Sequence, residues 1–209
     1  RFDQSIGKEK TLNVYGPPPT EQLTKRLVGK DIGAYWHDYI ARTNHPLSLW
    51  AYQDRGGTLP RQIPLINSKD IEPGFILNGK NWKITCKRVE HVQPYLDSLA
   101  YRVDLKNESI VFSGDTRPCE ALVDISANAD ALVMECARLD SEMKGNATAQ
   151  SESSALDAGK VAKEANVKNL ILTHQVHYLD EYKDEVINEV KLNFKGNIIW
   201  ADELMTINI

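Results

Sequence analysis

Apolar residues follow a helical spacing in the first part of the chain and then lose any sustained period. Between residues 20 and 40 they recur every three or four positions, interrupted near Gly29 and Gly33, which predicts helix. Before this segment, residues 11–15 predict a short strand, which the run Gly16-Pro17-Pro18-Pro19 stops. Residues 44–79 are rich in proline and glycine, so we expect a long irregular connection there, with at most one short strand.

Beyond residue 79 the pattern changes to strands and helices in alternation. The expected strands are residues 82–89, 99–104, 109–112, 131–134, 170–172, 198–200 and 205–207. The expected helices are residues 117–126, 153–165 and 179–194. Ser154 and Asp157 form a capping pair for the start of the second helix. Such alternation is typical of a layered α/β architecture, and a chain of 209 residues is long enough for a single domain over residues 1–209.

Composition narrows the classes of function. The formal net charge of -4 argues against a broad basic surface for nucleic acid, although a local basic groove fits within that total. No apolar run approaches the roughly 20 residues of a membrane helix, so no membrane partner is expected. The three cysteines form no CxxC pair, which indicates neither a disulfide framework nor a cysteine zinc site. A reducing cytoplasm is the expected compartment.

Three residues of types that commonly bind metal each come directly after an apolar strand. His91 ends Val-Glu-His, Asp115 lies in Phe-Ser-Gly-Asp-Thr, and His174 ends Leu-Ile-Leu-Thr-His. Imidazole nitrogen and carboxylate oxygen are zinc ligands, and manganese or iron also accepts them. Each residue alone has a structural interpretation, as a hydrogen-bonded histidine or a turn. From the residues alone, the two interpretations are evenly balanced.

Four segments in order carry a resemblance to a known family: residues 12–17, 91–102, 112–117 and 172–174. Together they resemble the C-terminal part of the ribonuclease Z and arylsulfatase-like branch of the metallo-β-lactamase superfamily. The resemblance extends over residues 11–209 and implies an incomplete αββα sandwich. It also implies a hydrolase with two divalent metal ions, usually zinc, that activate a water molecule.

The resemblance assigns roles residue by residue. His91 would complete the shell of the first metal, Asp115 would bridge both metals, and His174 would bind the second. Glu135 would orient a metal-bound histidine. In the family the other ligands come from a His-x-His-x-Asp-His loop before the segment that matches residues 11–17, and residues 1–10 contain no histidine. We therefore expect a chain that lacks its N-terminal metal-binding segment and is inactive alone. The alternative is a degenerate binding module of the same fold.

Glu152 departs from the family pattern, because this branch usually carries a histidine at the corresponding position. A glutamate there can act as a catalytic acid if the site raises its pKa. The alternative is a carboxylate near a helix start, favoured by the helix dipole.

The substrate expectation depends on one short connection. Ribonuclease Z enzymes with a tRNA-gripping arm insert it after the strand that matches residues 99–104, whereas here only Leu105–Glu108 separate two strands. With a pI near 5.8, this favours a small ester, such as a phosphodiester, an aryl sulfate or a lactone-like compound. The alternative is tRNA 3′-processing, with nucleic acid as the partner. Aromatic residues within 36–61 could wall an apolar pocket or pack a loop, and a homodimer is left open.

Overall fold

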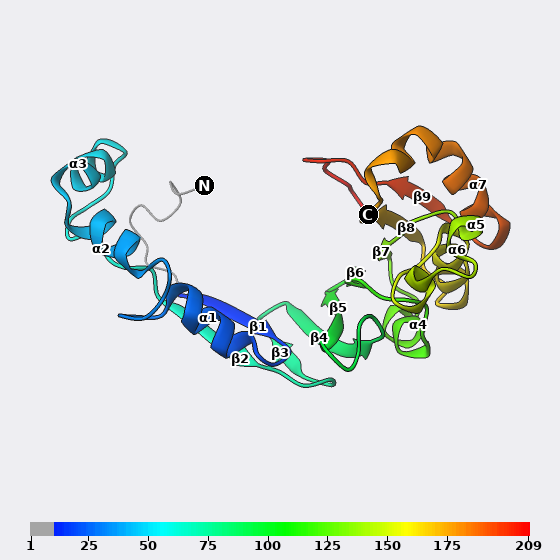
Figure 1. Ribbon diagram of the computed structural model, residues 1–209, viewed down its shortest axis with the longest axis horizontal. Coiled ribbons are helices and arrows are strands. Elements are labelled where there is room, and N and C mark those ends of the chain that lie inside the picture. The colour runs from blue at the N-terminus through cyan, green and yellow to red at the C-terminus, as the bar shows by residue number, and fades with distance from the viewer. Residues whose placement is uncertain (1–10) are drawn as a thin grey trace. The chain divides into compact units, whose positions relative to one another are not determined.

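The computed structural model describes residues 11–209, which divide into two units (Figure 1). The N-terminal unit extends to Ile71, and the C-terminal unit comprises Glu72–Ile209. Among the described residues, no helix is long and apolar enough to cross a membrane.

A two-stranded parallel sheet organises the N-terminal unit. β1 (Leu12–Gly16) pairs with β2 (Ile66–Asp70), with Leu12 opposite Ile66. Three helices lie between these strands in sequence: α1 (Thr20–Val28), α2 (Trp36–Asn44) and α3 (Pro46–Asp54). Glu21 and Asp70 exchange hydrogen bonds, each carboxylate accepting from the other residue's backbone N–H at 2.8 and 3.1 Å. This exchange fixes the start of α1 to the end of β2.

α3 and β2 both lie in the stretch expected to be irregular. The expected short strand is β2, but the helix was missed, because its apolar residues lie around the whole helix instead of along one side. Its start is nevertheless well specified. Pro46 occupies the first turn, and His45 Nδ1 accepts a hydrogen bond from Leu47 N at 3.3 Å.

The C-terminal unit is built on a seven-stranded sheet, ordered β3-β4-β5-β6-β7-β8-β9 within residues 72–209. The strands are β3 (Ile76–Asn78), β4 (Trp82–Val89), β5 (Ser98–Leu105), β6 (Ser109–Phe112), β7 (Ala131–Glu135), β8 (Asn169–Thr173) and β9 (Asn197–Trp200). Pairing is antiparallel from β3 to β6 and parallel from β6 to β9. The mixed sheet with helical connections confirms the α/β class predicted from the alternating pattern.

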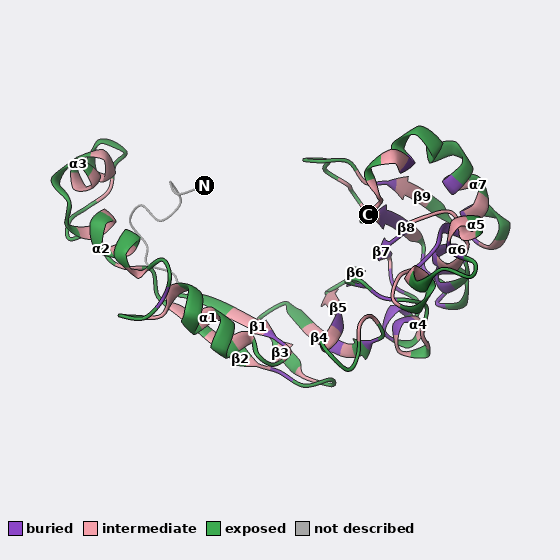
Figure 2. Ribbon diagram, viewed as in Figure 1, coloured by how far each residue is buried: buried purple, intermediate pink, exposed green. Residues whose placement is uncertain are grey.

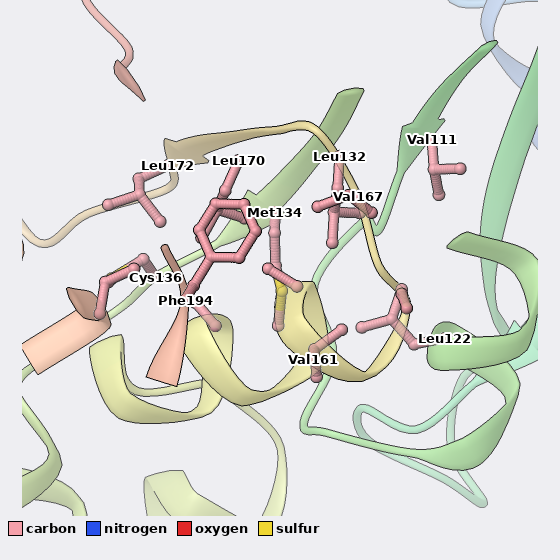
Figure 3. Close-up of a cluster of buried hydrophobic side chains, with 14 of the residues drawn as sticks. Val111, Leu122, Leu132, Met134, Cys136, Val161, Val167, Leu170, Leu172 and Phe194 are labelled. Carbon is pink, nitrogen blue, oxygen red and sulfur yellow. The ribbon is translucent and has the colours of Figure 1, made fainter. Parts of the chain in front are cut away.

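Helices connect the parallel strands and cover the sheet. They are α4 (Glu120–Ser126), α5 (Asp140–Met143), α6 (Ala155–Glu164) and α7 (Lys183–Asn193), with 3₁₀ turns at Ala147–Gln150 and His177–Tyr182. Side chains of β7, β8, α4 and α6 gather in one buried cluster with Phe194, beyond the end of α7 (Figure 3). In Figure 2 the buried residues concentrate in this unit, whereas α1, α2 and α3 bury no residue.

Three predicted elements differ from the structure. The helix expected over residues 179–194 begins as a 3₁₀ turn, and its α-helical part starts at Lys183. The helix expected from residue 117 begins at Glu120, because Pro118 disfavours helical backbone at Arg117, which instead forms a β-bridge with Glu90. The strand expected over residues 205–207 does not form within the described chain. Leu204 is fully exposed and Met205 is half exposed, so this apolar segment has no sheet surface to cover.

Candidate metal centre

The carboxyl ends of three neighbouring parallel strands bring three of the predicted site residues to one edge of the sheet. Asp115 lies three residues beyond β6, Glu135 ends β7, and His174 directly follows β8. Because β6, β7 and β8 are adjacent and parallel, their carboxyl ends open at the same edge, where α/β proteins place their ligands.

Asp115 and His174 form a pair whose spacing suits a shared metal ion. His174 Nε2 lies 3.6 Å from Asp115 Oδ1, and both side chains are about half exposed. That distance is too long for a hydrogen bond. Two ligand atoms at about 2.0–2.2 Å from a tetrahedral zinc lie about 3.3–3.6 Å apart, so the observed spacing fits two ligands of one ion.

The backbone adopts the left-handed conformation at His174 and at Gly114, the neighbour of Asp115. His174 has φ +60°, and Gly114, beside Asp115, has φ +62°. The left-handed conformation costs an L-residue about 1–2 kcal/mol, whereas glycine adopts it freely. Strained residues are enriched at functional sites, so the positive φ of His174 fits a functional position, although Asp31, Asn128, Asn166 and Leu204 share this conformation.

Thr116 joins the loops around Asp115. It is fully buried, and its backbone N–H donates to Glu135 Oε2 at 2.5 Å. Its carbonyl accepts from Ser153 Oγ at 2.6 Å, and its hydroxyl accepts from Glu90 N at 3.1 Å. Thr116 therefore links Glu90, which precedes His91, to Ser153, which follows Glu152.

Glu135 is a buried carboxylate at the centre of this arrangement. It is 1% exposed, and its Oε1 atom has no hydrogen-bond partner within the described chain. The pKa of Glu135 is raised to about 7, mainly by burial. The hydrogen bond from the Thr116 N–H and the charge of His174 lower this pKa, whereas the charges of Asp115 and Glu152 raise it. An unpartnered buried oxygen is costly, and a polar or cationic partner would satisfy it.

His91 is oriented by a hydrogen bond to the segment that carries Glu152. Its Nδ1 lies 2.8 Å from the carbonyl oxygen of Ser151. A carbonyl can only accept, so Nδ1 carries the proton and Nε2 is left as the acceptor. Metal-binding histidines are held in this way, with one nitrogen bonded to a carbonyl and the other facing the metal.

The three predicted ligands are not gathered into one cluster. In residues 11–209 no group of three His, Cys, Asp or Glu side chains is placed to hold a metal ion. The structure pairs Asp115 with His174, while His91 contacts Ser151. The donors fit part of a zinc-type site, and the convergence of His91 on it stays a prediction.

Glu152 is placed by its backbone, and its charge raises the pKa of Glu135. Its backbone N–H donates to Thr148 O at 2.9 Å, two residues before the cap of α6. The predicted capping pair is confirmed, because Ser154 and Asp157 form a reciprocal capping box. Since that box caps the helix, Glu152 is not needed to start it.

Thr116 and Ser153 were missed by the sequence analysis. Thr116 stands directly after Asp115, and Ser153 belongs to the Ser153-Ser154 pair before α6. Both are buried polar residues that link loops far apart in sequence. The only signal was their position beside predicted site residues.

Comparison with known proteins identifies relatives over nearly the whole chain. No family model matches. The chain is 38% identical to ribonuclease Z of Methanosarcina mazei, over 98% of this chain and 72% of that protein. It is 34% identical to ribonuclease Z of Myxococcus xanthus, over 97% and 72% respectively. The first alignment spans 254 positions, more than the 209 residues here, so that relative has internal segments without a counterpart in this chain.

Solved structures share the fold. The metallo-β-lactamase fold protein YhfI from Bacillus subtilis has a TM-score of 0.62 at 22% identity, over 92% of this chain and 63% of YhfI. The short form of human tRNase Z has a TM-score of 0.58 at 16% identity, over 97% of this chain and 69% of that enzyme. The fold is therefore that of the metallo-β-lactamase superfamily, and the chain belongs to the ribonuclease Z family.

Proposed function

We propose that this protein is a metal-dependent endonuclease of the ribonuclease Z type, which hydrolyses a phosphodiester during 3′-processing of tRNA precursors. The observation that carries the proposal is the Asp115–His174 pair at the sheet edge of a chain 38% identical to a ribonuclease Z over 98% of its length. Relatives named for an RNA substrate favour this alternative over the small-ester interpretation, which is not confirmed.

Asp115 and His174 would hold divalent metal, and His91 would present its Nε2 to the same centre. Bound divalent ions, usually zinc in this superfamily, supply an activated water and neutralise charge on the phosphate. Asp115 is expected to be shared between two ions. Three ligands, one of them shared, do not complete two coordination shells, so we expect the 209-residue chain alone to bind metal weakly and to be inactive.

Glu135 would help to position Asp115, because its carboxylate accepts a hydrogen bond from the backbone N–H of the next residue, Thr116. Glu152 is the candidate proton donor to the leaving oxygen. Its charge raises the pKa of Glu135, which supports a position near the candidate centre. A carboxylic acid in such a position typically contributes about 10²–10⁴-fold to a rate.

A small phosphoester is the second candidate substrate, and one connection favours it. β5 ends at Leu105 and β6 begins at Ser109, and Leu105 N donates to Glu108 O at 2.7 Å, which closes a tight turn. An inserted arm at this point is absent from the described chain.

The full-length protein tests the two substrates side by side. We expect metal-dependent cleavage of a tRNA precursor at its 3′ side, and loss of that cleavage in Asp115→Ala. Glu152→Gln should slow cleavage at least tenfold while leaving RNA affinity unchanged. Cleavage of an aryl phosphodiester without cleavage of the tRNA precursor would instead establish the second candidate.

A further inference from the structure

The hydroxyl of Tyr178 joins the segment that follows His174 to the segment that follows Glu135. It accepts a hydrogen bond from Arg138 Nη1 at 2.6 Å and donates one to Glu142 Oε1 at 2.8 Å. Tyr178 lies in the 3₁₀ turn after β8, whereas Arg138 and Glu142 lie after β7, 40 and 36 residues earlier in sequence. With one proton and one lone pair, the hydroxyl ties together two loops that leave the site edge of the sheet.

Both partners of this hydroxyl are themselves held. Glu142 Oε2 accepts from the backbone N–H of Leu139 at 3.2 Å, so each oxygen of that carboxylate has a donor. The Arg138 carbonyl accepts from Ala155 N at 2.9 Å, at the start of α6. The Arg138 guanidinium lies 5.9 Å from the centre of the Tyr178 ring, within the range of a cation–π contact. Because the guanidinium and the carboxylate are charged, both hydrogen bonds to the hydroxyl are of the stronger, charge-assisted kind.

The ring of Tyr178 is anchored as well as its hydroxyl. It packs against the buried cluster of the C-terminal unit. It also makes edge-to-face contacts with His177 and Tyr182, at 5.8 and 6.5 Å between ring centres, a favoured arrangement of aromatic rings. The next residue, Leu179, is fully buried in the same cluster. The turn that follows His174 therefore has a fixed position on the core.

His174 lies between two anchored segments. On one side β8 ends at Thr173, whose carbonyl accepts from Cys136 N at 2.9 Å. On the other side the anchored turn begins at His177, three residues later. The His174 side chain is about half exposed, so burial does little to fix its direction. A left-handed backbone persists only where the surrounding structure enforces it, and at His174 the segments on both sides are held.

We propose that Tyr178 is a positioning residue of the metal centre. Its hydroxyl, held between Arg138 and Glu142, fixes the turn that follows His174. It thereby keeps the His174 Nε2 atom beside Asp115 Oδ1, at the observed 3.6 Å. The proposal rests on the proposed function only in that this pair binds divalent metal. Tyr178 acts through His174 and is not itself a ligand.

The zinc affinity of the full-length protein tests this role without relying on catalysis. Tyr178→Phe keeps the ring and removes only the hydroxyl. We expect it to weaken zinc binding about tenfold, the lower end of the range for residues that orient metal ligands. Competition with a chromophoric chelator gives the affinity, at a temperature where circular dichroism shows every variant to be folded.

Loss of the carboxylate partner should act in the same direction. Glu142→Ala removes the acceptor of the Tyr178 proton and should also weaken zinc binding. Glu142→Gln keeps an oxygen at that place and should retain most of the affinity. The double variant of Tyr178→Phe with Glu142→Ala should bind zinc no more weakly than the weaker single variant, because both changes break one hydrogen-bond network.

Tyr182→Phe is the matched control, because it removes a hydroxyl from the same 3₁₀ turn outside the Arg138–Tyr178–Glu142 network. It should bind zinc like the wild type. Equal zinc affinity in Tyr178→Phe and wild type would overturn the proposal, even with a lower Tm, because the hydrogen bonds would then serve stability alone. Equal weakening in Tyr178→Phe and Tyr182→Phe would also overturn it, since the loss would not depend on this network.

The same variants separate this role from the proposed function. If Tyr178→Phe binds zinc more weakly than the wild type and neither protein cleaves a tRNA precursor, the positioning role stands and the proposed function fails. If the wild type cleaves the precursor and both proteins bind zinc equally, the positioning role fails alone. When both hold, cleavage by Tyr178→Phe should fall about tenfold at limiting zinc, in proportion to the lost affinity, and excess zinc should restore most of it.

Discussion

At the scale of single residues, Glu135 carries an electrostatic cost of burial beside the candidate metal centre. Its carboxylate is buried, one oxygen is unpartnered, and burial raises the pKa to about 7. An unfolded glutamate ionises near pH 4.5. Between these values the folded protein keeps the group protonated while the unfolded chain releases the proton. The wild type therefore loses stability as pH rises through this window.

Glu135→Gln removes this penalty. In the metal-free protein we expect the stability of the variant relative to wild type to increase as pH rises from about 4.5 to about 7. At higher pH the difference in the free energy of unfolding should be about 3 kcal/mol. The glutamine oxygen still accepts from the Thr116 N–H. Urea unfolding in EDTA at several pH values measures the difference. Parallel stability curves for the two proteins would show that Glu135 titrates normally.

His174 carries backbone strain at the candidate metal centre. His174→Asn keeps a polar side chain but places a residue that tolerates positive φ, so we expect a gain of up to about 1 kcal/mol and a Tm higher by about 2–4 °C. Metal affinity should fall, because the imidazole is lost. His177→Asn, in the following 3₁₀ turn, should give no stability gain. A Tm for His174→Asn below that of the wild type would contradict the strain argument.

At the scale of elements, the contact between α6 and α7 depends on one glycine. A Cβ added at Gly159 would lie 2.5 Å from the Val190 carbonyl oxygen and 3.1 Å from its Cα. Both atoms belong to backbone, so the helices themselves would have to separate. Gly159 is therefore required by close approach, since it lies within a regular helix.

Gly159→Ala should lower the free energy of unfolding by about 1–3 kcal/mol, the usual cost of overpacking. In an open helix the same change stabilises by about 1 kcal/mol, so the sign reports the contact. Lys163→Ala, on the exposed side of α6, is the matched control and should stay within about 0.5 kcal/mol of wild type. Thermal unfolding of the two variants measures both. A more stable Gly159→Ala protein would mean that α6 and α7 pack more loosely.

Sequence alone predicted the elements whose pattern is local. The apolar runs before Asp115 and His174 became β6 and β8, and the Ser154–Asp157 pair capped α6. α3 was missed because it has no single apolar side. The strand expected at residues 205–207 failed because apolar residues form a strand only where a partner exists.

Long-range contacts at the site lay beyond sequence reasoning. Asp115 and His174 could be named from their places after strands, but the 3.6 Å between them depends on the order of β6, β7 and β8. Thr116 has no local pattern at all, since its partners Glu90, Glu135 and Ser153 are 19 to 37 residues away. Only the folded chain shows that it joins these loops.

At the scale of the whole molecule, the core belongs to one unit. Among the described residues, Ile71 is the only buried hydrophobic residue of the N-terminal unit, and the rest lie beyond it. The seven-stranded sheet and its helices are also contained within residues 72–209. The C-terminal unit therefore holds both the apolar burial and the candidate ligands His91, Asp115 and His174.

Residues 72–209 should fold without the N-terminal unit, because nearly all buried apolar area comes from within them. We expect cooperative thermal unfolding with a midpoint within a few degrees of the 209-residue chain. Leu132→Ala, which empties a fully buried position on β7, should lower stability by about 2–5 kcal/mol in both chains and so show that the core is the same. Residues 1–71 alone should show little cooperative unfolding, since α1, α2 and α3 bury no side chain. Circular dichroism melts of the three chains measure this directly. Loss of cooperativity in residues 72–209 would mean that the N-terminal unit is needed to complete the core.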